Sequence, residues 1–175
     1  MNRPASAFAG SVGLLLLSLW LGAAIFFSAV VAPAAFASLR SFHVTNLNEI
    51  AGTIVSRALA VINVSGVLIS LLVLALTLTT ERKNMKASVF ARSAALTLMA
   101  VTTAVGHWVI AARMRSLRLA MVTIDLVPPD DQRRIAFNDL HRYSVALLML
   151  GMLAAFAAII LKGFRPVLGS RKTSS

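Results

Sequence analysis

Residues 8–39 read FAGSVGLLLLSLWLGAAIFFSAVVAPAAFASL and contain no charged side chain. A helix that crosses the hydrocarbon core of a bilayer needs about 20 predominantly apolar residues. This stretch is longer, so it predicts a membrane-spanning helix that tilts or continues beyond the hydrocarbon. The apolar core of a secretory signal peptide has only about 7–15 residues. We therefore expect the segment to remain in the mature protein.

Three further apolar stretches follow, and the four predicted spans cover residues 10–36, 55–79, 91–112 and 143–162. Pro33 lies near the far end of the first span, where its missing N–H bends or ends the helix. Asn46-Leu47-Asn48-Glu49 has the pattern of a capping box at the start of the second helix. Pro128-Pro129 end the third helix, and Asp130 can cap the fourth.

The apolar pattern of the third span continues at Met114, Leu117 and Met121, with arginines between them. This spacing indicates an amphipathic helix with one wet face. We therefore predict an all-α, four-transmembrane-helix bundle in which helices 3 and 4 extend beyond the membrane as an antiparallel hairpin. Residues 1–168 form this single domain, and residues 169–175 form a disordered tail.

The composition agrees with a membrane protein. Hydrophobic residues make up 58% of the chain and charged residues 13%, against about 45–50% and about 25% in soluble proteins. The net charge is +11, but the basic residues flank apolar segments, where they anchor helices in lipid head groups. The lipid bilayer is therefore the expected partner, and nucleic acid is not. Cysteine is absent, which excludes disulfides, thiolate metal sites and cysteine nucleophiles.

An even number of spans places both termini on one side of the membrane. The short loop 81–92 is dense in Lys and Arg, whereas residues 113–142 mix six arginines with four aspartates. The positive-inside rule then predicts cytoplasmic N- and C-termini. Arg outnumbers Lys by 13 to 4, a composition typical of GC-rich bacteria, so we predict a multi-pass protein of the bacterial inner membrane.

Small residues spaced by four predict where the helices approach one another, because lipid tails are as apolar as leucine and burial alone does not drive association. The same small-residue faces offer a route to a homo-oligomer. The positions are Ser18 and Gly22, Ala100 and Ala104, and Gly151 and Ala155, together with Gly66 and Gly106.

Polar residues at membrane depth are costly and point to function. Asn63 and His107 lie inside the predicted spans, and further polar residues lie near the same membrane face. With the predicted topology, all three histidines face the outer side. The candidate binding cluster comprises Arg57, Glu49, His43, His107, Asp139, His141 and Ser144.

Three interpretations of this cluster remain open. In the first, Arg57 extends its charge to the interface while Glu49 and Asp139 pair with basic neighbours. In the second, His107 and His141 hold haem or a metal in a membrane redox protein, as facing helices of a bundle can. In the third, a polar pocket binds or transports a small molecule. The sequence contains no nucleophile motif, phosphate loop or carboxylate pair, so the main prediction is a non-enzymatic protein without a cofactor or metal.

Several short motifs together resemble the transmembrane-protein-205-like family. The resemblance implies a four-helix integral membrane protein with a domain of unknown function, and it supplies no activity. It draws attention to Pro33, Arg57 and His141, and it does not single out His107. The motifs are Trp20-Leu-Gly22 with Phe26-Phe27, Val31-Ala32-Pro33 with Phe36, Ala51-Gly52 with Arg57, and Phe137 with Leu140-His141 and Ser144.

Overall fold

The computed structural model describes residues 3–81 and 87–163, and in these ranges every regular element is a helix. The first long helix consists of α1 (Arg3–Phe26), the π-helical turn η1 (Phe27–Val31) and α2 (Ala32–Ser41). The second is α3 (Leu47–Glu81). The third consists of α4 (Ala87–Ala104), the π-helical η2 (Val105–Ile110) and α5 (Ala111–Met121). The short 3₁₀ helix η3 (Ile124–Leu126) precedes the fourth, α6 (Gln132–Gly163).

All four helices are long and apolar enough to cross a membrane, over Phe8–Ser41, Leu47–Glu81, Ala87–Met121 and Gln132–Lys162. The predicted all-α, four-span bundle is therefore confirmed. The first three helices extend past the predicted spans at both ends, and the fourth begins before its predicted span and ends with it at Lys162. The longest contain 35 residues, which at 1.5 Å per residue is about 52 Å, against a hydrocarbon core of about 30 Å. The predicted tail, residues 169–175, lies outside the described residues.

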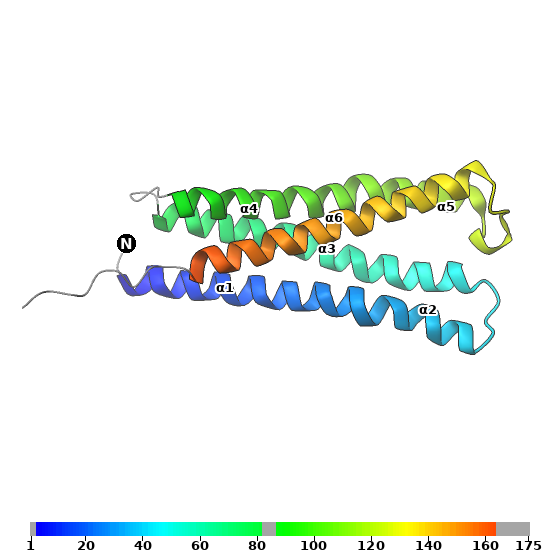
Figure 1. Ribbon diagram of the computed structural model, residues 1–175, viewed down its shortest axis with the longest axis horizontal. Coiled ribbons are helices and arrows are strands. Elements are labelled where there is room, and N and C mark those ends of the chain that lie inside the picture. Colours follow the sequence, from blue (N-terminus) through cyan, green and yellow to red (C-terminus); the bar gives the residue numbers. More distant parts are fainter. Residues whose placement is uncertain (1–2, 82–86, 164–175) are drawn as a thin grey trace, which may run out of the picture.

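The bundle has two ends that differ in structure. At the terminal end lie Arg3, Glu81, Ala87 and Gly163; at the loop end lie residues 42–46 and 122–131 (Figure 1). The described ends of the chain are thus on the same side, as an even number of spans requires. At the loop end α5 packs antiparallel against the start of α6, which is the predicted hairpin, and α2 and α3 reach equally far.

The core is centred on Trp20, which is 3% exposed. Its indole Nε1 donates a hydrogen bond to the Ile62 carbonyl at 2.9 Å, and this removes the cost of burying a lone N–H donor. Gly66 and Gly151 provide the space for the ring, because a Cβ at Gly66 would lie 3.0 Å from Trp20. This family-motif tryptophan therefore joins α1, α3 and α6.

Most of the predicted small-residue contacts are present. Gly66, Gly106, Gly151 and Ala155 are buried between helices. The prediction is wrong for Ser18 and Gly22, which are both exposed, and an added Cβ at Gly22 would have nothing within 4 Å. The first helix presents Trp20 and Leu17 to the bundle instead. A spacing of four places Ser18 and Gly22 on one face, and only the neighbouring bulky residues decide which face points inward.

Pro33 does not end its helix. The chain passes from η1 directly into α2, with Pro33 in the first turn of α2, and stays helical to Ser41. Proline lacks the N–H that would continue the ladder and its ring clashes with the preceding turn, so the wider π-helical turn just before it accommodates the ring.

Two capping predictions were wrong in the identity of the residue. Asn46 has a positive φ of 59°, and Asp125 rather than Asn46 accepts the first amides of α3. At α6 the cap is Asp131 rather than Asp130, because Asp131 accepts the Arg133 N–H at 2.8 Å. The hydrogen bond from the Arg133 side chain lowers the pKa of Asp131 from 3.8 to about 2.

Candidate functional site

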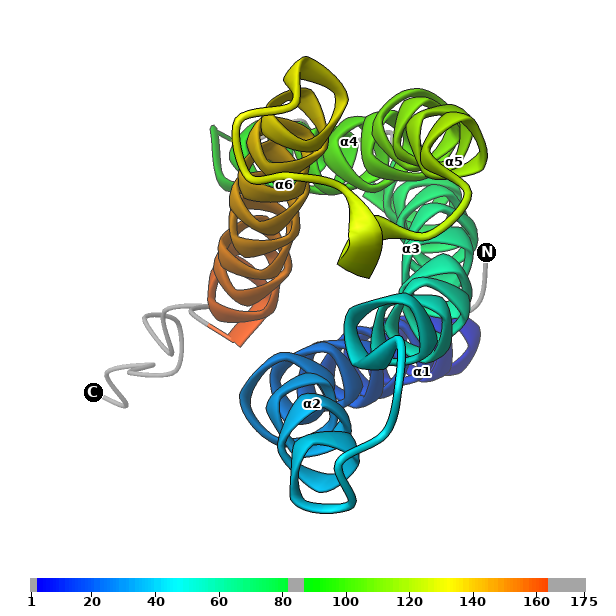
Figure 2. The ribbon, with the colours of Figure 1, turned by 90° about the vertical axis from the view of Figure 1, so that its right-hand side faces the viewer.

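At the loop end, α2, α3, α5 and α6 surround a cavity of about 590 Å³. Figure 2 looks onto this end of the bundle. In this view α6 and α2 lie apart from each other on the left, and α3 and α5 lie on the right. The apolar lining residues are Phe36, Val55, Leu59, Ala60, Ala111, Met114, Ile124 and Phe137. The polar ones are Asn48, Thr53, Ser56, Arg57, Asn63, His107, Arg115, Arg118, Arg134, Asn138, His141 and Ser144.

Helical periodicity brings these residues together. On α3 the lining positions include Asn48, Gly52, Ser56, Leu59 and Asn63, at intervals of four, four, three and four. Residues at those intervals share one face of an α-helix. The third helix contributes 107, 111, 115 and 118 in the same way. α3 and the third helix thus each turn one face, which carries both polar and apolar side chains, toward the cavity.

The cavity is strongly basic. Its lining includes four arginines and two histidines, and among the described residues that line it there is no aspartate or glutamate. The Glu49 carboxylate lies next to the lining, with 3.6 Å between its Oε1 and Arg118 Nε. Arg57 and Arg115 form no ion pair with any residue that the structure describes. The cavity therefore carries more positive charge than its surroundings neutralise.

Two of the four arginines are held in place by neighbours. Arg118 Nη1 donates to Thr53 Oγ1 at 3.4 Å, and its guanidinium lies 5.5 Å from the centroid of the Phe137 ring. Gly52 leaves room for it, because a Cβ at that position would collide with Arg118 Nη2. Arg134 Nη1 donates to the Val127 carbonyl. These contacts preorganise part of the positive charge.

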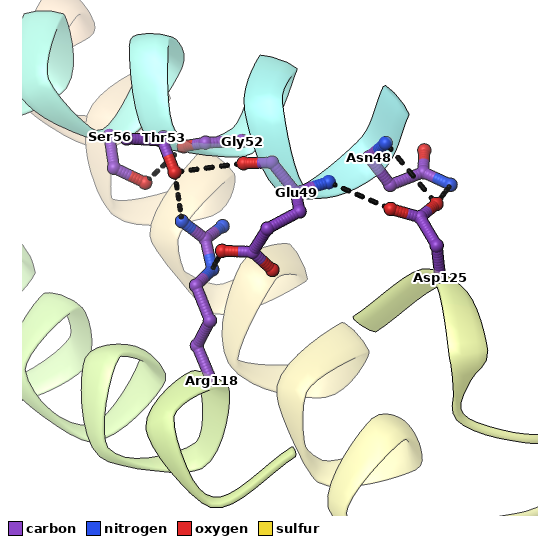
Figure 3. A network of polar contacts seen from close by, with 7 residues as sticks. All are labelled: Asn48, Glu49, Gly52, Thr53, Ser56, Arg118 and Asp125. Atoms are coloured by element: carbon purple, nitrogen blue, oxygen red, sulfur yellow. Dashed lines mark hydrogen bonds and ion pairs between the residues drawn. The ribbon is translucent and has the colours of Figure 1, made fainter. Parts of the chain in front are cut away.

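The segment that closes the loop end is tied to α3 by a carboxylate (Figure 3). Asp125 Oδ1 accepts hydrogen bonds from the Asn48 amide at 3.2 Å and from Asn48 Nδ2 at 2.6 Å. Asp125 Oδ2 accepts the Glu49 amide at 3.1 Å. These amides are otherwise unpaired at a helix N-terminus, where negative charge is stabilised. The bonds position Ile124, which lines the cavity.

The deep end of the cavity is polar but carries no carboxylate among the residues described. Asn63 and Ser144 are buried, and the Asn63 amide lies beside Gly106, whose added Cβ would be 3.4 Å from Asn63 Nδ2. His107 lies in η2, with its ring 5.0 Å from Trp108 in an edge-on arrangement. Its buried Nδ1 has no hydrogen-bond partner among the described residues. Such π-helical segments frequently occur at functional sites.

The structure brings together most of the predicted cluster. Arg57, His107, His141 and Ser144 line the cavity, and Glu49 lies directly beside it through Arg118. Two members are elsewhere: His43 is exposed in the loop before α3, and Asp139 is exposed on α6, where it pairs with Arg142 at 3.7 Å. Of the family-motif positions, Phe36, Gly52, Arg57, His141 and Ser144 line the cavity. Trp20 and Phe27 are buried in the bundle.

Arg115, Arg118 and Arg134 were not among the predicted site residues. The sequence pattern places Arg115 and Arg118 on the wet face of an amphipathic helix, and both line the cavity. Their spacing from His107 along one helical face was the available signal. In the described part of the chain, no group of three or more His, Asp or Glu residues is arranged to hold a metal ion.

A family model described as a domain of unknown function, DUF4149, matches residues 15–123 of the chain. The chain belongs to the DUF4149 family. The matched region of this DUF4149 protein runs from α1 to the end of α5 and includes the cavity residues of α2, α3 and α5. No curated protein and no solved structure matches the chain. The DUF4149 protein is therefore an integral membrane protein whose family supplies no activity.

Proposed function

We propose that this DUF4149 protein is a non-enzymatic membrane protein that binds an anionic ligand in the cavity, in a binding or transport-related role. The supporting observation is the presence of four arginines and no carboxylate among the described lining residues. A charge removed from water is costly unless it is paired. An anion that enters the cavity supplies the missing partner.

The identity of the side chains supports an oxyanion as the bound group. Arginine presents several donors in a rigid fork that matches carboxylate and phosphate oxygens. Arg118 and Arg134 are positioned by Thr53 and Val127, whereas Arg57 and Arg115 keep their donors available. An arginine that only anchors a helix would extend outward to the head groups, whereas all four of these arginines line the cavity, with Arg57 and Arg115 exposed.

Pyrophosphate is a suitable first ligand for a binding experiment in an uncharged detergent at constant ionic strength. We expect a saturable rise in the thermal unfolding midpoint, because a ligand that binds only the folded state stabilises it. Arg115→Gln should abolish most of the rise. Arg113→Gln is the matched control, because Arg113 is exposed on the same helix and does not line the cavity. The proposal fails if pyrophosphate has no saturable effect or if both variants respond alike.

A second candidate is a haem- or metal-binding redox protein, because His107 and His141 line one cavity. Neutral imidazole nitrogens are the commonest protein ligands for metals. A visible spectrum of the purified protein, with and without added haemin, tests this candidate. A stoichiometric Soret band that His107→Ala and His141→Ala both remove would replace the anion-binding proposal.

We further propose that the protein lies in a bacterial inner membrane with cytoplasmic termini, and that it is related to the transmembrane-protein-205-like proteins. The dense positive charge of residues 81–92 supports the orientation. The cavity then opens on the outer side. An alkaline phosphatase reporter fused after Ser175 should be inactive, and an active reporter would overturn the orientation. The positions Phe137, His141 and Ser144 that support the kinship all line the cavity.

A further inference from the structure

The depth of the cavity relates it to the bilayer. Its deepest lining residues, Asn63 and His107, lie 16 and 14 residues from the loop-end residues Leu47 and Met121, which is about 20–24 Å along a helix. Helices of about 52 Å centred on a hydrocarbon core of about 30 Å extend about 11 Å beyond it at each end. The floor of the cavity therefore lies about 10 Å inside the hydrocarbon, and its mouth lies at the head groups.

The charges are distributed along this depth. Arg115, Arg118 and Arg134 all lie within about 10 Å of the loop end, at head-group level. Farther in, Leu59 and Ala111 line the cavity together with uncharged polar groups, and Arg57 is the one charged lining residue there among those described. The cavity thus has a basic entrance and an interior with fewer charges and with apolar side chains such as Leu59 and Ala111, which matches a molecule with an anionic head and a hydrocarbon part.

The cavity also has a side that faces lipid. Phe36 of α2 and His141 of α6 both line it, yet α2 packs against α3 while α6 packs against α1, α4 and α5. From the terminal end to the loop end, α6 moves away from the first helix and toward α5 (Figures 1 and 2). α2 and α6 separate along parts of helices that are long and apolar enough to cross the membrane. A hydrocarbon chain can therefore leave the cavity between them.

We propose that the ligand is a phosphate-headed amphiphile, with the head held by Arg115, Arg118 and Arg134 and the hydrocarbon chain directed inward and out between α2 and α6. This inference rests on the proposed function and specifies its ligand class. The volume of about 590 Å³ is large enough for a phosphate head and a hydrocarbon chain. A chain too long for the cavity extends into lipid between α2 and α6.

Binding of three compounds in an uncharged detergent tests the head and the hydrocarbon chain of this ligand separately. The compounds are dodecyl phosphate, inorganic phosphate and dodecanol. We expect dodecyl phosphate to bind saturably and at least about tenfold more tightly than inorganic phosphate, as burial of two or more methylenes provides. Dodecanol should not bind. Because any charged amphiphile collects in the micelle, the effect must be lost in Arg115→Gln and retained in Arg142→Gln. The Arg142 side chain is 82% exposed on the outside of α6.

Cysteine labelling tests whether the hydrocarbon part enters the cavity, and the cysteine-free sequence makes single labels unambiguous. Leu59→Cys places a thiol on the lining, whereas Val61→Cys places one on the outside of α3, where Val61 is 70% exposed. With dodecyl phosphate at about ten times its Kd, labelling at position 59 should slow about tenfold by mass action. Labelling at position 61 should not change.

The outcomes separate the two proposals. If inorganic phosphate binds as tightly as dodecyl phosphate, and position 59 is not protected, the amphiphile is excluded while the anion-binding function stands. If none of dodecyl phosphate, inorganic phosphate and pyrophosphate binds saturably, both proposals fail. If Arg115→Gln retains the dodecyl phosphate effect, the binding is to the micelle surface and the amphiphile proposal is overturned.

Discussion

The two ends of the bundle are made by the same four helices but pack very differently. At the terminal end, Glu81, Arg92 and Lys162 surround a space of only about 10 Å³, about one water. Lys162 Nζ lies 3.6 Å from Glu81 Oε1 there. At the loop end, four arginines line a cavity of about 590 Å³, and the neighbouring carboxylate of Glu49 pairs with one of them, Arg118.

Small residues and the course of α6 explain the difference. Gly66, Gly151 and Ala155 let the helices meet closely around Trp20. Toward the terminal end from Trp20, α6 packs against α1. Toward the loop end, arginine side chains on facing helices repel one another and need water or a counter-anion between them. A membrane bundle can therefore be closely packed at one end, where small residues let the helices meet, and remain open at the other, where like charges repel.

The largest predicted effect on stability is at the closely packed level around Trp20. Gly66→Ala should lower the free energy of unfolding by about 2 kcal/mol, because overpacking typically costs about 1–3 kcal/mol and exceeds the gain from a better helix former. The added Cβ would lie 2.9 Å from Thr103 Cγ2 and 3.0 Å from Trp20. Equilibrium unfolding in detergent measures this. Gly22→Ala, with nothing within 4 Å, should be neutral or stabilising, and equal losses in both variants would contradict the account.

A smaller loss is expected where the loop end is closed. Asp125→Ala removes the acceptor of the Asn48 and Glu49 amides, and loss of a helix cap costs about 1 kcal/mol. Hydrogen exchange at these two amides should accelerate. Asp139→Ala serves as the control, because its exposed pair with Arg142 on α6 contributes little. Unchanged exchange in Asp125→Ala would show that the capping interaction is unimportant.

A glycine-to-alanine substitution should cost much less stability at the loop end than at the closely packed level around Trp20. Gly52→Ala displaces the Arg118 guanidinium, but this group ends a flexible side chain beside a cavity and can move. Its contact with Glu49 is long, at 3.6 Å, and can form again after a small movement of the guanidinium. We expect the unfolding free energy to stay within about 1 kcal/mol of wild type. A loss as large as that of Gly66→Ala would show that the open end is packed as rigidly as the closed one.

The smallest effect concerns pH at the start of α6. The Arg133 side chain holds the pKa of Asp131 at about 2, below the usual 3.8. A depressed folded-state pKa gives stability that is present above the unfolded pKa and lost as the pH falls through the folded one. Thermal unfolding should therefore show a loss between about pH 4 and about pH 2, which Asp131→Asn should remove. Asp130→Asn should keep it, and identical pH profiles for the two variants would contradict the assignment.

The fold was largely predictable because uninterrupted apolar runs can only be helices in lipid. The start of α3 at Leu47 followed from local chemistry. The prediction that Pro128-Pro129 end the third helix was wrong, because α5 already ends at Met121, where Val122 takes a positive φ of 63°. The caps could not be identified in the same way, since Asp125 reaches α3 from another part of the chain and no short-range pattern encodes that contact.

The candidate site was predicted in part. Arg57, His107, His141 and Ser144 stood out because polar groups are expensive at membrane depth, and all four line the cavity. Arg115 and Arg118 did not stand out, because a charged helical face has the same sequence pattern whether it meets water or a cavity. His43 and Asp139 were included by nearness in sequence, but the turn before α3 and the rotation of α6 place them outside.

The bonds from Asp125 to the start of α3 also bear on biosynthesis. The acceptor lies 77 residues after Asn48, so the emerging α3 has no carboxylate partner for these amides until the third span has been made. A nascent chain arrested before residue 125 should therefore keep a frayed α3 end that becomes ordered once the next segment emerges. The cap of the second helix is thus supplied by a residue that follows the third span in the chain.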